Sequence, residues 1–384
     1  MARAVPSPFL TPAHDGPVPI PGRATPEGTQ RFRDAAVRDR AIAFEHFREA
    51  PGGLQLSSIG LGTYIGAPDG PTDIAVEQAV GVCLASGRVN LLDTAINYRY
   101  QRAERSIGRA VARLVAKGDV ARDAVFVATK SGYLAPDAES PIPPNRWVDE
   151  ELVRPGVLSP DDIVDGSHAM SPSYLADQFE RSRANLGLES IDLIYLHNAP
   201  DAQLPSIGRD AFLGRLEQAF QLYEGLRDRG RLGAYGIATW DSLRSARSEP
   251  GYLSLDAAVR VARKVGGERH GFRYVQFPFN VGMPEAWTHP NQLVGGSVEP
   301  ILRAAPRLGV ACMTSVPLMQ GRLARSGPKR TGLSPAQTAL QFARSAPGSI
   351  AALVGQKNPT HLSENLDLAV RRPWDVATFE SVLS

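Results

Sequence analysis

The segment Ile191-Asp192-Leu193-Ile194-Tyr195-Leu196-His197 is a short apolar run that ends in a titratable side chain. Short runs of this kind, rich in β-branched residues, are typical of strands buried on both faces of a sheet. Seven further runs have the same character, so the sequence predicts eight strands. Their ranges are Ile59–Thr63, Val89–Asp93, Val125–Lys130, Ile191–His197, Leu232–Ala238, Tyr274–Phe277, Gly309–Thr314 and Ser349–Val354.

Segments with helical periodicity alternate with these runs almost to the C-terminus. The expected helices lie near 72–86, 101–117, 172–186, 209–229, 255–264, 298–307, 335–344 and 359–368. Eight strands, each followed by a helix, predict an α/β fold of the closed (β/α)8 TIM-barrel type rather than an open doubly wound sheet. A Rossmann sheet needs a glycine-rich turn after its first strand, and the sequence from Gly60 to Gly66 matches that pattern poorly.

The 384 residues fit one barrel with additions, because such barrels typically contain about 250 residues and tolerate insertions. We expect residues 1–30 to form an extended, flexible N-terminal arm and residues 31–384 to form a single barrel domain. Residues 131–171 are too long for an ordinary strand-to-helix connection and are interpreted as an inserted loop, either a lid over the barrel mouth or a peripheral decoration. Ala41–Leu56 is expected to form a hairpin that plugs the other end of the barrel.

Composition excludes several classes of protein. Lys and Arg number 42 against 40 Asp and Glu, which lacks the basic excess of most nucleic-acid-binding proteins. No apolar stretch reaches the roughly 18 residues of a membrane span. Only Cys83 and Cys312 are present, which excludes a disulfide framework and indicates a reducing cytoplasm. We therefore expect a cytoplasmic protein with a small-molecule partner; the sequence leaves its oligomeric state open.

Three successive predicted strands end in a titratable residue, namely Asp93, Lys130 and His197. Because neighbouring strands of a barrel end at the same mouth, we expect these side chains to meet there, with Tyr98 on the loop after the first of them. Each residue alone has an ordinary structural explanation as a cap, an ion-pair partner or a packed ring. Buried lysine and aspartate are rare unless paired, so the four together predict a proton-transfer site.

The same residues resemble the aldo-keto reductase family in identity, order and spacing. The matching motifs are Asp93-Thr-Ala-x-x-Tyr98, Glu104, Gly108, Thr129-Lys130, Asp192-Leu-x-x-x-His197, Gln276-Phe-Pro-Phe-Asn280, Pro317-Leu-Met-Gln-Gly321, Val354-Gly355 and Glu364-Asn365. The resemblance covers about Ala41 to Val370. It implies a (β/α)8 barrel that binds a nicotinamide dinucleotide without a metal and reduces an aldehyde or ketone, or oxidises an alcohol in reverse.

The resemblance also implies roles for the four polar residues. Tyr98 is expected to be the general acid, with Lys130 lowering its pKa, Asp93 holding that lysine and His197 orienting the substrate carbonyl. Tyr100 is a nearby competitor for the acid, but its spacing from Asp93 departs from the family pattern. We favour Tyr98.

The family's cofactor contacts transfer by position. The expected cofactor-binding residues are Gly62, Thr63, Asp93, Thr239, Gln276, Ser315, Pro317, Leu318, Gly321, Gly355, Lys357, His361, Glu364 and Asn365. The resemblance assigns Gln276 to the nicotinamide carboxamide, and Lys357 with His361 to the adenosine ribose and its phosphate. A lysine there suits a 2′-phosphate, so we expect NADPH rather than NADH. The alternative is that Lys357 and His361 are ordinary solvated residues.

Two positions depart from the family pattern. Ala238-Thr239 stands where a Ser-Asn pair is common, and Ser315 replaces the aromatic residue that stacks on the nicotinamide. The candidates to supply an aromatic ring instead are Tyr64, Tyr133, Trp147 and Trp240. These departures motivate a second hypothesis, an NADP-binding regulatory or interaction subunit with little turnover.

A third reading takes Lys130 as the Schiff-base lysine of an aldolase-like barrel. The substrate and the physiological direction of reaction are not readable from the sequence. Tyr133, Trp147 and His168 either line a pocket or pack the insertion.

Overall fold

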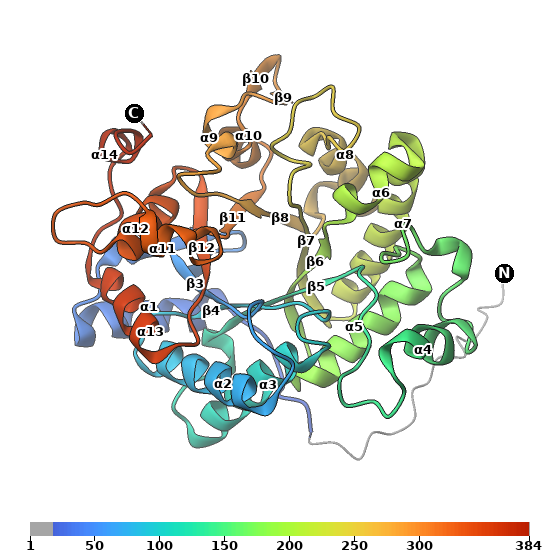
Figure 1. Cartoon of the computed structure of the whole chain (residues 1–384), viewed down its shortest axis with the longest axis horizontal. Coiled ribbons are helices and arrows are strands. Elements are labelled where there is room, and N and C mark those ends of the chain that lie inside the picture. The colour runs from blue at the N-terminus through green and yellow to red at the C-terminus, as the bar shows by residue number, and fades with distance from the viewer. Residues whose placement is uncertain (1–17, 384) are drawn as a thin grey trace.

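The computed structural model describes residues 18–383, and its centre is a closed barrel of eight parallel strands (Figure 1). The strand order is β11-β12-β3-β4-β5-β6-β7-β8, so consecutive strands along the chain are neighbours. Their bounds are β3 Ile59–Gly62, β4 Leu91–Asp93, β5 Phe126–Ser131, β6 Ile191–His197, β7 Leu232–Ala238, β8 Phe272–Pro278, β11 Ala311–Ser315 and β12 Ser349–Gly355. The predicted (β/α)8 barrel is thus confirmed.

Side chains fill the barrel, so it encloses a core and not a channel. Leu91, Phe126, Leu193, Tyr195 and Tyr274 belong to one buried cluster contributed by strands on different sides of the barrel. A second, larger cluster lies between the strands and the surrounding helices. Strands buried on both faces explain why the runs in the sequence are apolar throughout rather than alternating.

Helices flank the barrel and connect its strands (Figure 1). The principal ones are α2 Gly70–Ala85, α3 Arg102–Lys117, α5 Pro172–Leu186, α6 Ala199–Ile207, α7 Arg209–Asp228, α8 Leu255–Gly266, α10 Ile301–Arg307, α12 Pro335–Ser345 and α13 Pro359–Leu366. Local signals mark their ends. The Asp69 side chain caps α2 by accepting a hydrogen bond from the Thr72 amide, and Gly118 ends α3 in a left-handed conformation.

Shorter elements complete the chain. They are η1 Phe44–His46, η2 Arg122–Ala124, η5 Gly267–Arg269, α9 Glu285–Thr288, β9 Gln292–Val294, β10 Ser297–Glu299, η6 Met319–Gly321, α11 Arg322–Ser326, η7 Asp367–Val370 and α14 Val376–Glu380. Among residues 18–383, none of the helices is long and apolar enough to cross a membrane.

The hairpin expected within Ala41–Leu56 is present as β1 Phe47–Ala50 paired antiparallel with β2 Leu54–Ser57. Ala50 and Leu56 join the cluster inside the barrel, so the hairpin covers the end opposite the strand C-termini.

The expected arm over residues 1–30 is helical in its last five residues, because α1 spans Pro26–Arg40. Thr25 caps this helix, Pro26 stands in its first turn, and Gly28 and Thr29 are buried. The sequence interpretation weighed the prolines as signs of extended chain and missed that one of them begins a helix. Residues 1–17 lie outside the described residues.

The insertion 131–171 folds as a small unit with its own core. Its elements are α4 Pro144–Val148, the π-helical turn η3 Asp149–Val153 and the 3-10 turn η4 Pro160–Asp162. Trp147, Leu152, Leu158 and Ala169 are buried together against Tyr174 of α5. A bridge between Tyr133 and His168 closes its base.

Candidate active site

A buried ion pair joins the ends of β4 and β5. The Lys130 Nζ atom lies 2.6 Å from Asp93 Oδ2 and donates a second hydrogen bond to the Thr94 carbonyl at 2.8 Å. Gln276, near the end of β8, donates from Nε2 to the other Asp93 oxygen at 2.9 Å. All three of these side chains are buried. Strands β4, β5 and β8 therefore contribute one connected polar group.

Tyr98 lies beside this pair, on the loop that follows β4. The Lys130 ammonium is 4.9 Å from the centre of the Tyr98 ring, and the ring of His197 is 5.6 Å away in an edge-to-face arrangement. The ring of Tyr64, on the loop after β3, packs against the Tyr98 ring with its centre 5.0 Å away. The structure thus brings together the four residues that the sequence singled out. Tyr100, the competitor, is exposed at the mouth.

His197 is fixed by neighbours that the sequence interpretation did not assign. Its Nδ1 atom lies 3.1 Å from Asn97 Oδ1, and Asn97 lines the cavity next to Tyr98. His168 Nε2 lies 3.0 Å from the His197 carbonyl oxygen, and Tyr133 packs against the His197 ring at 5.1 Å. The only sequence feature that could have indicated a role for Asn97 was its position directly before Tyr98.

The pKa values of this cluster follow from its burial. Burial raises the pKa of Tyr98 well above its ordinary value near 10, and the Asp93 carboxylate acts in the same direction. The net direction is opposite to the lowering that the sequence interpretation expected, because burial and the Asp93 carboxylate both raise the pKa of Tyr98. Burial lowers the pKa of Lys130, although Asp93 opposes it, and burial with the nearby Lys130 charge lowers the pKa of His197 well below 6.5. Tyr98 is accordingly a phenol and His197 a neutral imidazole at pH 7.

A cavity of about 900 Å³ opens at this end of the barrel. Tyr64, Asn97 and Tyr100 line it from the barrel loops, and Tyr133, Pro136 and Val148 line it from the insertion. The insertion is thus a wall of the cavity rather than a peripheral decoration. Trp147 instead packs inside the insertion, where the Arg181 guanidinium lies 5.2 Å from its ring centre.

Several of the expected cofactor residues meet at the same strand ends. Gly62 of β3 pairs in register with Gly355 of β12, and the Thr63 hydroxyl donates to the Asp93 carbonyl at 3.2 Å. The Thr239 amide donates to the Gln276 carbonyl at 2.8 Å. Within residues 18–383 the buried Thr239 hydroxyl has no hydrogen-bond partner.

The loop after β11 and the start of α13 hold the remaining expected residues. The half-buried Ser315 ends β11, and the buried Pro317 is followed by half-buried Leu318 and Gly321. Lys357 donates to the Ile65 carbonyl at 2.9 Å, which links the start of α13 to the loop after β3.

Three residues of α13 differ in what they contact. His361 is exposed. The Asn365 amide donates to Gln356 at 3.2 Å, and the Glu364 carboxylate accepts a hydrogen bond from the Ser334 hydroxyl. Both amide and carboxylate thus have partners within the protein.

The comparison with protein families identifies the class of protein to which this barrel belongs. The model of the family described as "Aldo/keto reductase family" matches residues 58–261, more than half of the chain, so the chain belongs to that family. A search of curated proteins gives no match.

Solved structures of aldo-keto reductases share the fold. The holo form of aldo-keto reductase AKR11C1 from Bacillus halodurans is 16% identical, with a TM-score of 0.58 over 88% of this chain and 95% of that one. The glycerol dehydrogenase AKR11B4 from Gluconobacter oxydans is 18% identical, with a TM-score of 0.58 and the same coverage. An aldo/keto reductase from Klebsiella pneumoniae in complex with NADP and acetate is 15% identical, with a TM-score of 0.56 over 88% of this chain and 94% of that one.

Proposed function

We propose that this protein is an NADPH-dependent oxidoreductase that reduces an aldehyde or ketone to an alcohol, with Tyr98 as the general acid. The observation that carries the proposal is the position of Tyr98 at the mouth of the barrel, beside a buried lysine–aspartate pair and a neutral histidine. Membership of a family of oxidoreductases supports the same reaction class.

Tyr98 is suited to hold a proton until the reaction needs it. Its raised pKa keeps the phenol protonated at neutral pH, and the phenol gives its proton to the carbonyl oxygen as the carbonyl carbon is reduced. The phenolate that forms lies beside the Lys130 ammonium, which Asp93 keeps in place. The Lys130 ammonium therefore stabilises the negative charge that develops on Tyr98 during the proton transfer.

His197 is suited to orient the carbonyl. Asn97 Oδ1 accepts a hydrogen bond from the Nδ1–H group of the neutral ring, which fixes the orientation of the ring beside Tyr98. Burial keeps the ring neutral, so it orients the substrate without competing with Tyr98 as an acid.

A nicotinamide dinucleotide bound at the strand ends would supply the hydride. Thr239 and Gln276 would hold its carboxamide, and Ser315 with the loop to Gly321 would hold the remainder up to the pyrophosphate. Lys357, with one hydrogen bond to the Ile65 carbonyl, offers a charge for a 2′-phosphate, which favours NADPH over NADH. Tyr64, beside Tyr98, is the aromatic group that we propose in place of a ring at Ser315.

The substrate is proposed to be a small molecule, because the cavity of about 900 Å³ has the size of a ligand pocket. We also propose that the protein acts in the cytoplasm, because Cys83 and Cys312 are buried free thiols, as is usual in a reducing compartment.

The proposal is tested by fluorescence titration with NADPH and NADH, followed by absorbance-monitored oxidation of NADPH with aliphatic, aromatic and sugar carbonyls. We expect tighter binding of NADPH and turnover of at least one carbonyl class. Binding without turnover across the panel would favour the regulatory subunit, and no binding of either nucleotide would contradict both hypotheses.

A further inference from the structure

The backbone immediately after Tyr98 takes an unusual conformation. Arg99, Tyr100 and Gln101 have φ values of 50°, 53° and 73°, so three consecutive residues lie in the left-handed region, and none of them is glycine. Side chains with a Cβ atom rarely adopt this region, and the conformation persists only where surrounding contacts enforce it. The contacts that hold this turn are therefore informative about how Tyr98 is placed.

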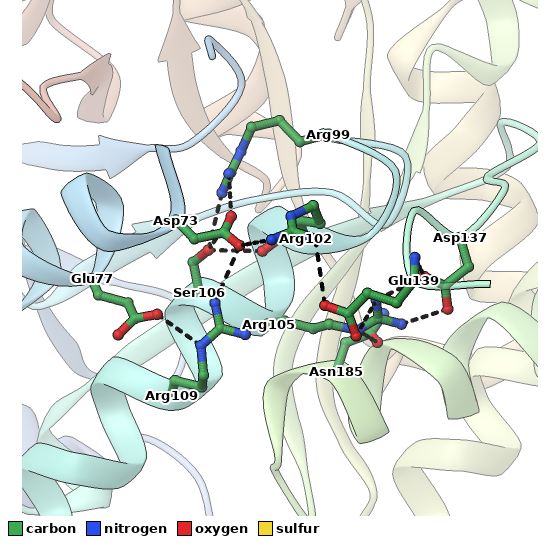
Figure 2. A network of polar contacts seen from close by, with 10 residues as sticks. All are labelled: Asp73, Glu77, Arg99, Arg102, Arg105, Ser106, Arg109, Asp137, Glu139 and Asn185. Atoms are coloured by element: carbon green, nitrogen blue, oxygen red, sulfur yellow. Dashed lines mark hydrogen bonds and ion pairs between the residues drawn. The ribbon is translucent and has the colours of Figure 1, made fainter. Parts of the chain in front are cut away.

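Arg99 anchors the turn to helices α2 and α3. Its Nη1 atom donates to Asp73 Oδ1 at 2.5 Å, and its Nη2 atom donates to the Ser106 hydroxyl at 3.1 Å. The Arg99 and Asp73 side chains are 1% and 6% exposed, so the pair is shielded from water. Arg102 donates to the second oxygen of Asp73 at 2.6 Å. Figure 2 shows Arg99, from the loop, and Arg102 and Ser106, from α3, gathered around Asp73.

The insertion holds the turn from the other side. Gln101 Nε2 donates to the Ala135 carbonyl at 2.9 Å, and the Ala138 amide donates to the Tyr100 carbonyl at 3.2 Å. The Asp137 carboxylate accepts two hydrogen bonds, of 2.7 and 2.6 Å, from the guanidinium of Arg105 in α3 (Figure 2). The turn is thus fixed between the barrel helices and the wall of the cavity.

We propose that Arg99 is a positioning residue for Tyr98: its buried pair with Asp73 holds the left-handed turn 99–101, and that turn sets the place of the Tyr98 ring. This inference rests on the proposed role of Tyr98 as the acid. Proton transfer requires donor and acceptor within hydrogen-bond reach, and a displacement of about 1 Å can cost about 100-fold in rate. Loss of Arg99 therefore acts on turnover through Tyr98.

A matched pair of substitutions tests this directly. Arg99→Ala removes the guanidinium and keeps the Cβ atom that disfavours a φ of 50°, whereas Arg99→Gly removes both. We expect kcat to fall about 10- to 100-fold in Arg99→Ala, with the Kd for NADPH changed less than about twofold. Arg99→Gly should retain several times more turnover than Arg99→Ala, although it lacks the same ion pair.

Controls separate positioning from general loss of structure. Arg109→Ala removes a half-exposed arginine that also faces Asp73, at 3.5 Å, and should leave kcat unchanged. Asp73→Asn weakens the contact with Arg99 by removing the charge of its partner. This variant replaces Arg99→Ala as the test if Arg99→Ala does not fold, and it should lower kcat about 3- to 10-fold. Far-UV circular dichroism checks the fold of each variant.

The outcomes distinguish the two proposals. If Tyr98→Phe is inactive but Arg99→Ala is fully active, only the positioning role of Arg99 is overturned. If Arg99→Ala does not fold, full activity of Asp73→Asn has the same meaning. Equal loss in Arg99→Ala and Arg99→Gly would show that the turn is not what Arg99 holds. A Tyr98→Phe variant with normal turnover would instead overturn the proposed acid.

Discussion

The Lys130 ammonium lies 2.6 Å from the Asp93 carboxylate, and the two residues come from the ends of adjacent strands that bury both side chains. Asp93 pairs in register with Ala128 of β5. Lys130 lies two residues further along β5, and its side chain extends back to the Asp93 carboxylate. Two buried charges are stable here because each is the partner of the other.

Tyr98→Phe should abolish most turnover while cofactor binding remains. Phenylalanine retains the ring that packs against Tyr64 and His197 and removes only the ionisable hydroxyl. General acids contribute typically 10²- to 10⁴-fold, so kcat should fall by about that factor. Tyr100→Phe removes the hydroxyl of the exposed neighbour and should leave kcat near normal. A larger loss in Tyr100→Phe would reassign the acid.

Lys130→Met should reduce both stability and activity, because it leaves the Asp93 carboxylate buried without its cation. Breaking one partner of a buried ion pair costs roughly 3–5 kcal/mol of unfolding free energy. Adding Asp93→Asn removes the unpaired charge, so the double variant should recover much of the stability in urea denaturation. Its kcat should stay low. Recovery of activity in the double variant would mean that Lys130 serves the fold alone.

Acid should destabilise the protein through His168. Burial lowers the pKa of His168 to about 4, against 6.5 in an unfolded chain. As the pH falls, His168 therefore takes up a proton in the unfolded state before it does so in the folded state. This difference lowers the free energy of unfolding between pH 6.5 and pH 4, and it has no effect above pH 6.5. The loss is at most on the order of 3 kcal/mol. Urea midpoints measured from pH 7 to pH 4.5 should fall less steeply in His168→Gln.

The matched control for this series is His361→Gln, which changes an exposed histidine. Its urea midpoints should follow those of the unaltered protein at every pH. An unaltered slope in His168→Gln would show that other groups govern the acid response.

Gly108→Ala should destabilise the packing of α3 on α5. A Cβ atom at Gly108 would lie 2.6 Å from the Asn185 carbonyl oxygen and 2.7 Å from that of Leu186, and both are backbone atoms. Overpacking of this kind costs about 1–3 kcal/mol. Gly81→Ala in α2 meets no atom within 4 Å and should stabilise by about 0.5–1 kcal/mol. Thermal unfolding of both variants measures the contrast, and equal shifts would contradict the close contact.

Sequence patterns predicted the barrel because each of its strands is apolar on both faces, and that property is local. The segment Ile191–His197 is a strand over its whole length, as expected. The meeting of Asp93, Lys130, Tyr98 and His197 also followed from local information, since the ends of parallel strands share one mouth.

Other features depended on contacts between distant residues. The helix over Pro26–Arg40 is held in part by burial of Gly28 against Asp123, which no local pattern reveals. Trp147 was a candidate for the cavity, but the insertion buries it in its own core. Likewise, Asn97 gained a role only when the fold placed it beside His197.

The sequence by itself determined the barrel, the order of its elements and the residues that gather at its mouth, because periodicity and strand ends are encoded in short segments. Only the tertiary structure decided the electrostatics of that mouth. The direction in which the pKa of Tyr98 shifts depends on burial and on the nearby Asp93 carboxylate, which are properties of packing. The turn held by Arg99 likewise exists because α2, α3 and the insertion meet around it.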